Sequence, residues 1–312
     1  MSNFDFKPSE WYPVQDKKVL EFCRNLTRED MINFKHSNPD YKVHIVPNPC
    51  SAIAAELFNW IWRSDVEDKK TVIIFPNSWR DVYTCAANMC NDYNVSARNI
   101  VAFCMDEWAD EHGNVAPITY EPSLGGHFLR EFYGSFRKDL RPDLKNMHYY
   151  TNENINCYSQ MIEDEGGADL AISATGWVGH TAFIDPMTNA FKADNLEEFL
   201  TLGARFVDNH RLTLIQNSNA ALFGSCGDMY ATPYCSVSVG PKEIFNARDH
   251  LERLDLGYLG GYSSWERMVA RLQCFGPVSM DCPASMTQLT KDTVYMSEDM
   301  ARPITTQELI SY

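Results

Sequence analysis

The chain has 312 residues, of which 45% are hydrophobic and 22% charged, and its formal net charge is −15. Such a chain is globular and can bury a sizeable core. The acidic balance argues against nucleic acid and an anionic membrane surface as partners, although local arginines and helix N-termini can still bind a small anion. The sequence has no apolar run near the roughly 20 residues of a membrane helix. Residues 1–7 lack the pattern of a secretory signal, so we expect a cytoplasmic protein.

Ten cysteines are scattered singly, and none forms a C-x-x-C pair. Several lie in apolar runs, such as Cys104 in V-A-F-C-M and Cys235 in Y-C-S-V-S-V. Thiols of this kind usually behave as small buried hydrophobes in a reducing compartment. This pattern favours free thiols over a disulfide framework or a zinc site.

Strands and helices are expected to alternate along most of the chain. Residues 1–15 predict an arm that packs on the domain surface. After it we expect, in chain order, helix 16–34, strand 41–46, helix 51–62, strand 71–75, helix 79–93 with Asn77 or Ser78 as its cap, strand 99–105, loop 109–122, helix 123–136, strand 147–150, helix 155–165 and strand 170–174. Beyond residue 186 the pattern is looser and predicts strand 212–215, helix 217–223, strands 234–239 and 251–256, helix 264–272 and strand 293–296.

This alternation indicates βαβ units. We therefore predict a doubly wound, Rossmann-like α/β fold, with a mainly parallel sheet flanked by helices. The sequence contains no linker, repeat or low-complexity tract. We expect an N-terminal arm and helix over residues 1–40 and a single α/β domain over residues 41–312.

One notable motif follows the predicted strand 170–174. Gly176, Gly179, His180 and Asp185 come shortly after it. Glycines just past a strand end let the backbone approach a ligand, and ligands of open α/β sheets bind outside the carboxyl ends of the strands. A histidine there is suited to proton transfer near neutral pH. The alternative is a tight turn from a strand into a helix, with a histidine on the surface.

A second motif is the acidic pair Asp106-Glu107, which directly follows the predicted strand 99–105. Carboxyl groups at the end of a buried strand, in a partly dry cleft, can act as a proton-abstracting base. The alternative is a solvated acidic loop that continues into Asp110 and Glu111.

Taken in order, four features resemble the glucosamine-6-phosphate deaminase/isomerase family and its wider group, which includes 6-phosphogluconolactonases. They are the strand ending at Pro76, the segment Met105-Asp106-Glu107-Trp108, Ser123 before a helix, and the segment 174–186. The family reads M-D-E-Y at the second and G-x-G-N-D-G-H-I-A-F-N-E-P at the last, and its L-T-V-G resembles residues 236–240. The resemblance covers roughly residues 50–300, with specific motifs only at 103–108 and 174–186.

The resemblance implies a role for each matching residue. Asp106 matches the acid that moves a proton between C1 and C2 during aldose–ketose isomerisation, and His180 matches the histidine that assists ring opening. Asp185 replaces a glutamate that bonds this histidine and fixes its tautomer; alternatively, Asp185 caps a turn before Pro186. Glu107 completes the expected catalytic group. The resemblance implies no metal and no organic cofactor.

The chain also departs from the family at several positions. Val178 stands where the family has an aspartate. The phosphate loop P-T-G-G-T-P is here residues 76–81, with the bulky Trp79 in place of a glycine. A phosphate-binding arginine aligns near Asn219 and a lysine near Gly260. The phosphate anchors are therefore lost or replaced, and Arg80 is either a substitute contact for an anion or an exposed helix residue.

We therefore expect an aldose–ketose isomerase or deaminase that acts on a sugar or sugar phosphate, with an altered phosphate site and a different substrate. Two alternatives stay open: a catalytically inactive sugar-binding or regulatory homologue, and a lactone hydrolase in which His180 activates water. The expected substrate-binding residues are Asn77, Ser78, Arg80, Ser123, Gly176, Trp177 and Gly179. The expected partner is a small-molecule sugar or sugar phosphate, and homo-oligomerisation is left open.

Overall fold

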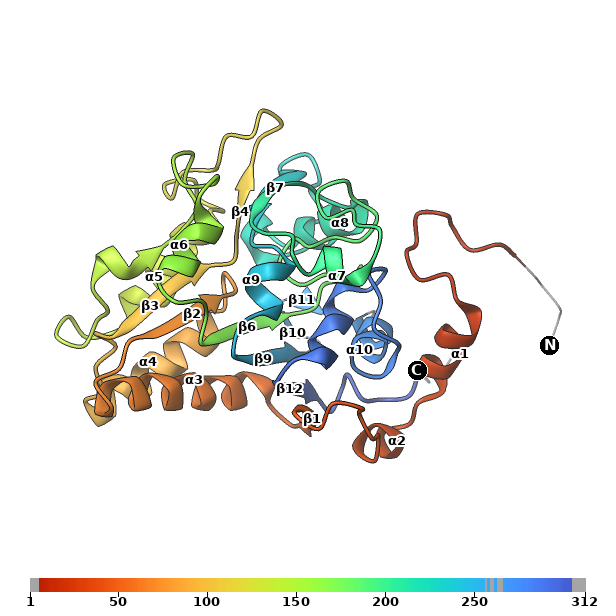
Figure 1. Cartoon of the computed structure of the whole chain (residues 1–312), viewed down its shortest axis with the longest axis horizontal. Helices are drawn as coiled ribbons and strands as arrows, with labels where there is room; N and C mark the ends of the chain where they lie inside the picture. Colours follow the sequence, from red (N-terminus) through yellow and green to blue (C-terminus); the bar gives the residue numbers. More distant parts are fainter. Residues whose placement is uncertain (1–5, 256, 259–260, 263–265, 305–312) are drawn as a thin grey trace.

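The computed structural model describes residues 6–255, 257–258, 261–262 and 266–304, and Figure 1 shows their arrangement. Its main sheet has seven parallel strands in the order β1-β12-β9-β6-β2-β3-β5. Their bounds are β1 Tyr41–Val46, β2 Thr71–Phe75, β3 Ile100–Cys104, β5 Met147–His148, β6 Leu170–Ala174, β9 Asp249–Leu254 and β12 Asp292–Ser297. The predicted parallel sheet is confirmed.

Helices connect these strands. The α-helices are α1 Lys17–Asn25, α2 Arg28–Ile32, α3 Pro49–Val66, α4 Arg80–Tyr93, α5 Leu124–Glu131, α6 Tyr158–Asp164, α7 Leu196–Phe199, α8 Arg211–Ser218, α9 Pro241–Phe245 and α10 Glu266–Phe275. Four 3-10 helices are η1 Tyr133–Ser135, η2 Leu144–Asn146, η3 Ala221–Phe223 and η4 Pro283–Leu289. Two short strands, β10 Gly257–Tyr258 and β11 Gly261–Tyr262, form a separate antiparallel pair.

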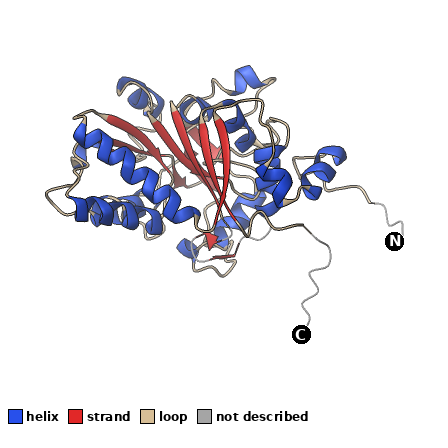
Figure 2. Cartoon of the chain, turned by 90° about the horizontal axis from the view of Figure 1, so that it is seen from below, coloured by secondary structure: helices blue, strands red, loops and turns tan. Residues whose placement is uncertain are grey.

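Both faces of the main sheet are covered, as Figure 2 shows. Alternate side chains of a strand point to opposite faces, so a strand buried on both sides is apolar throughout. In β2, Ile73 and Phe75 pack with α3, α4 and α5, whereas Val72 and Ile74 belong to the core on the other face, which includes α6. Further along that second face, α10 packs on β9 and β12. The predicted doubly wound fold is confirmed.

A second, antiparallel sheet lies beside the main one. Its order is β4-β8-β7, with bounds Asp106–Ala109, Cys235–Ser238 and Arg205–Asp208. The chain leaves the main sheet at Met105, whose N–H still donates to the carbonyl of Phe75 (3.0 Å) and whose carbonyl accepts from Val239 (2.8 Å). Asp106 therefore lies at the junction of the two sheets. It is the first residue of strand β4, so the alternative of a solvated acidic loop does not hold for residues 106–109.

Three local predictions were wrong. The expected helix 16–34 is two helices, because Thr27 starts a new one with a capping box to Asp30. Residues 212–215 lie in helix α8, since a four-residue apolar run fits a buried helix as well as a strand. Neither Asn77 nor Ser78 caps α4: its N-cap is Trp79, which makes no side-chain cap bond.

The N-terminal segment packs on the C-terminal helices. Helix α1 lies against α10, where the Cys23 thiol is 3.7 Å from the carbonyl oxygen of Arg271. The carbonyl of Trp11 lies 3.1 Å from Nε2 of His210, the N-cap residue of α8. All ten cysteines fall in the described ranges and all are free thiols, as predicted. Within those ranges, no helix is both long and apolar enough to cross a membrane.

Candidate functional site

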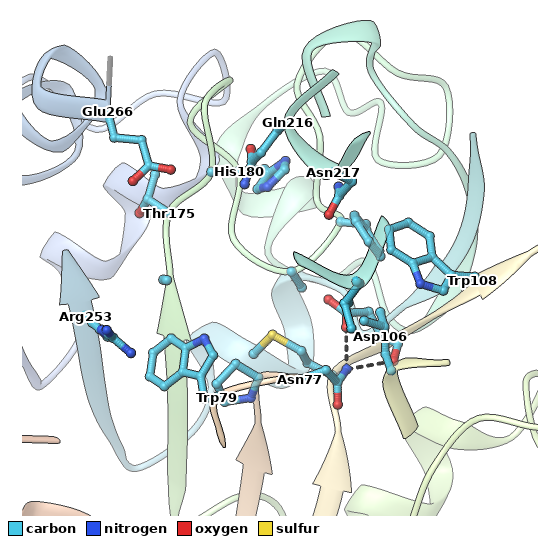
Figure 3. A pocket seen from close by; sticks show the side chains of 18 of the residues that line it. Asn77, Trp79, Asp106, Trp108, Thr175, His180, Gln216, Asn217, Arg253 and Glu266 are labelled. Carbon is cyan, nitrogen blue, oxygen red and sulfur yellow. Dashed lines mark hydrogen bonds between the residues drawn. The ribbon is translucent and has the colours of Figure 1, made fainter. Parts of the chain in front are cut away.

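A pocket opens over the carboxyl ends of four neighbouring strands, β3, β2, β6 and β9 (Figure 3). The direction in which the chain adds strands to the sheet reverses between β2 and β6. The next strand after β2, β3, lies on one side of this pair, whereas the next strand of the main sheet after β6, β9, lies on the other. Ligands of open α/β sheets bind at such a switch point. Asn77 follows β2, Asp106 follows β3, and Gly176 follows β6. The parallel sheet therefore brings segments that are distant in the sequence to one site.

Asp106 is buried in this pocket, with 7% of its surface exposed. The Asn77 amide nitrogen donates to the carboxylate of Asp106 and to its main-chain carbonyl (2.8 Å), as Figure 3 shows. Burial raises the pKa of Asp106 to about 7; the Asn77 hydrogen bond and the charge of His180 oppose this rise, and Glu107 adds to it. A carboxyl group with a pKa near 7 can both take and return a proton at neutral pH.

His180 is held by a carboxylate and a hydroxyl group. Its Nδ1 bonds the Asp185 carboxylate, and Oγ1 of Thr213 lies 3.0 Å from the same nitrogen. Asp185 also accepts from Oγ1 of Thr213 (2.8 Å) and from the main-chain N–H of His210 (2.7 Å). Because Nδ1 is engaged, the arrangement favours the tautomer with the proton on Nδ1 and leaves Nε2 for a ligand.

The two glycines of the motif shape this site. A Cβ on Gly176 would lie 2.0 Å from Nε2 of His180, so a side chain there would displace the imidazole. Gly179 has φ +88°, and a Cβ on it would lie 2.8 Å from the Cys282 sulfur. Both positions require glycine. Gly176 lines the pocket, whereas Gly179 does not.

The structure places the Glu107 carboxyl group outside the pocket lining. It accepts from Oγ of Ser123 (2.7 Å) and from the N–H groups of Trp108 (2.8 Å), Leu124 (2.9 Å) and Gly125 (2.8 Å). These partners bind it to the N-terminus of α5, where a carboxylate is favoured. The geometry does not support the expected catalytic role of Glu107 and indicates a structural one. Ser123 is the N-cap of α5 and likewise does not line the pocket.

The other predicted binding residues separate into two groups. Asn77 lines the pocket, whereas Ser78 and Arg80 line an adjoining outer cleft between α4 and α5. Trp177 is buried outside the pocket lining. Its main-chain N–H donates to the side-chain oxygen of Gln216 (2.8 Å), and its side chain hydrogen-bonds Glu266.

Of the positions where the chain departs from the family, Val178 is buried outside the lining. Asn219 is exposed and bonds the carbonyl of Ile215. Gly260 lies outside the described residues.

The sequence analysis missed several residues of the site. Thr213, Gln216 and Asn217 come from α8, where the spacing of three and four places them on one side of the helix. That spacing was a usable signal, but the prediction of a strand over 212–215 hid it. No motif marked Arg253, Asp255 and Glu266, which also line the pocket.

The side of the pocket remote from Asp106 carries several charges. Arg253 is buried, and its guanidinium carbon lies 5.5 Å from the centroid of the Trp79 ring. Its guanidinium group forms ion pairs with Asp81 (3.0 Å) and Asp255 (3.5 Å). Burial raises the pKa of Glu266 well above its usual range, and Asp255 adds to this rise. In the described part of the chain, no group of three or more His, Cys, Asp or Glu side chains is placed to hold a metal ion.

Comparisons with known proteins agree with this architecture. No protein-family model matches the chain. It is 26% identical over 189 residues to glucosamine-6-phosphate deaminase 2 of Bacillus subtilis. The matched segment makes up 57% of this chain and 64% of that protein. It is 24% identical over 255 residues to a glucosamine-6-phosphate deaminase-like protein of Bacteroides thetaiotaomicron. Here the matched segment makes up 80% of this chain and 34% of that protein. The chain thus matches less than two thirds of the length of each.

Solved structures show the same fold. A monomeric glucosamine-6-phosphate deaminase superposes with a TM-score of 0.64 at 19% identity, over 83% of this chain and 98% of that one. A 6-phosphogluconolactonase from Thermotoga maritima superposes with a TM-score of 0.55 at 14% identity, over 82% of this chain and 99% of that one. These findings confirm the resemblance noted in the sequence: the chain is similar in sequence to glucosamine-6-phosphate deaminases and shares its fold with one of them and with a 6-phosphogluconolactonase.

Proposed function

We propose that the chain is a sugar isomerase or deaminase-like enzyme that uses enediol chemistry, with Asp106 as the base and His180 as the ring-opening group. The observation that carries this proposal is the position of both side chains in one pocket, with burial raising the pKa of Asp106 to about 7. The curated relatives, which are named as deaminases, support the same class of reaction. The substrate is a small sugar or sugar derivative.

Each proton in the proposed reaction has a place. Nε2 of His180 takes the proton of the C1 hydroxyl group and gives it to the ring oxygen as the bond from C1 to the ring oxygen breaks, and Asp185 stabilises the positive charge that the imidazole carries between these two transfers. The Asp106 carboxylate removes the proton from C2; that electron pair forms the C1–C2 double bond of the enediol, and the carbonyl electron pair moves to O1. A proton passes from O2 to O1, the carbonyl group forms at C2, and Asp106 gives its proton to C1, which completes the aldose–ketose exchange.

Hydrogen exchange at carbon tests this proposal whatever the product of the reaction is. The full chain is incubated in deuterated water with sugars first selected by thermal shift, since a ligand that binds the native state raises its melting temperature. We expect deuterium on the carbon that Asp106 deprotonates. Asp106→Asn should slow this exchange by about 10²–10⁴-fold while the sugar still binds. Asp92→Asn, at an exposed position of α4, is the matched control. A sugar that binds well but shows neither hydrogen exchange at carbon nor conversion to product would refute the proposed enzymatic function. It would support the alternative of a binding protein without catalytic activity.

Lactone hydrolysis is the second candidate, because the fold is shared with a 6-phosphogluconolactonase and the His180–Asp185 pair can activate water. Hydrolysis needs no proton transfer between carbons. In that case Asp106→Asn should retain most of its activity on a lactone, whereas His180→Gln should abolish it. The two substitutions therefore separate the two reactions.

The ten free cysteines support a reducing compartment, and we place the enzyme in the cytoplasm on this ground. The net charge of −15 supports a small-molecule substrate over a nucleic acid.

A further inference from the structure

The pocket has a far wall, formed by Trp79, Arg253, Asp255 and Glu266, on the side remote from Asp106. Figure 3 shows Arg253 and Glu266 on the side of the pocket away from Asp106, and Trp79 between Arg253 and Asn77. We propose that this wall binds the hydroxyl or amino groups of an unphosphorylated sugar, with Glu266 as the residue that determines specificity. The inference rests on the proposed function, because it takes the carbon that reacts to lie at Asp106.

The charge of the far wall does not suit a phosphate group. Its one cationic side chain among the described residues, Arg253, is already paired with two carboxylates, Asp81 and Asp255. Glu266 adds a third carboxyl group that is 7% exposed and faces the same space. A phosphate dianion would therefore enter a region with no net positive charge, whereas a hydroxyl or an ammonium group would not be repelled there.

The hydrogen-bonding atoms left in the pocket point to the same ligand class. Within the described structure, the atoms that line the pocket and are buried without a hydrogen-bond partner include Oδ1 of Asn77, an acceptor, and Nε1–H of Trp79, a donor. These residues are 5% and 1% exposed, and both line the pocket. Buried polar atoms are almost always hydrogen-bonded, so these two favour a bound polar ligand. A hydroxyl group can donate to the first and accept from the second, whereas a phosphate dianion can only accept.

Glu266 can adapt to either kind of sugar. Burial disfavours its charged form, and the Trp177 hydrogen bond partly offsets this. As a neutral acid the group donates to a sugar hydroxyl and accepts from another; beside an ammonium group it ionises and forms an ion pair. Trp79, whose ring lies beside Arg253, contributes a broad apolar surface to the same pocket, against which the C–H face of a sugar ring can pack.

The test is calorimetric titration of the full chain with two matched pairs: glucosamine and its 6-phosphate, and glucose and its 6-phosphate. We expect the unphosphorylated member of each pair to bind at least about tenfold more tightly. Glu266→Gln should reduce this preference at least about fivefold, because it removes a carboxyl group but keeps the shape. Glu121→Gln, which removes an exposed carboxylate that lines only the outer cleft, should leave the preference unchanged. Comparing the affinity for glucosamine with that for glucose shows whether the far wall contacts an amino group or a hydroxyl group of the sugar.

If Glu266→Gln does not fold, Asp255→Asn provides the second variant, since it leaves Arg253 with one carboxylate fewer and should also reduce the preference. Equal or tighter binding of the phosphorylated sugars, no binding of any of the four sugars, or an unchanged preference in the folded variants would each overturn the inference. Because binding is measured apart from exchange at carbon, a sugar that binds as expected but does not exchange would refute the proposed function and leave this inference standing.

Discussion

Replacing Asp106 by Asn should make the protein more stable at pH 8 while it removes the proposed base. Burial raises the pKa of this carboxyl group from 3.8 to about 7, a rise of about 3 pH units. Since one unit corresponds to about 1.36 kcal/mol, keeping Asp106 ionised in the folded protein costs about 4 kcal/mol. Asn has nearly the same shape and no charge, so the variant avoids this cost.

The sign of the pH dependence follows from proton linkage. Between pH 4 and pH 7 the folded state holds the Asp106 proton more tightly than the unfolded state does, so the stability of the unmutated protein falls as the pH rises. Below pH 4 the group is protonated in both states, and above pH 7 it is ionised in both. The stability difference between Asp106→Asn and the unmutated protein should therefore grow by about 4 kcal/mol from pH 4 to pH 8.

Urea denaturation followed by circular dichroism at pH 4.5, 6 and 8 measures this difference without any substrate. Asp92→Asn, the same substitution at an exposed position, is the control. A difference for Asp106→Asn that is equal at pH 4.5 and pH 8 would show that the folded protein does not raise the pKa of this group. In that case Asp106 would be ionised at neutral pH and would not have the raised pKa that suits it to take up and return a proton.

Three further substitutions test neighbouring parts of the structure. Glu107→Gln replaces one carboxylate oxygen by an amide NH2 group, which leaves a buried main-chain N–H at the start of α5 without an acceptor and should lower the free energy of unfolding by about 1–3 kcal/mol in urea titrations. Burial raises the pKa of Glu252 to about 7, so the unmutated protein loses stability as the pH rises from about 4.5 to 7; Glu252→Gln should flatten this part of the stability profile. Asp185→Asn should slow turnover of cyclic sugars by roughly 10²-fold but that of open-chain sugars less, because His180 acts before the proton transfer.

The sequence predicts the parts of the fold that depend on local patterns. Strands β2, β3 and β6 are short apolar runs, and Pro76, Asp106 and Gly176 come within two residues of their ends. Burial on both faces makes such strands apolar throughout, and the polar turn that follows marks their carboxyl ends. Because these ends meet at one edge of a parallel sheet, the shared position of Asp106 and His180 also followed from the sequence.

The rest of the site depends on contacts that no local pattern records. Helix α8 brings Thr213 to the His180–Asp185 pair, but its N-cap is His210, which is not among the usual N-cap residues. Glu107 carries the same charge as Asp106 and directly follows it, yet its carboxyl group turns to α5. Only the tertiary structure distinguishes these two acids.

Trp79, which departs from the family motif, lies on another side of the pocket from Asp106 and His180, which match it. Asp106 and His180, which match, adjoin the carbon at which the proton would move, whereas Trp79, which departs, lies in the far wall with Glu266. Groups at the first side act in the transition state, and contacts at the second hold the substrate equally before and during the reaction. Substitutions of Asp106 or His180 should therefore lower kcat, whereas Glu266→Gln should change KM and leave kcat nearly unaltered. A Glu266 variant whose main effect was on kcat would place this carboxyl group among the reacting groups and would contradict the division of the pocket into a reacting side and a binding side.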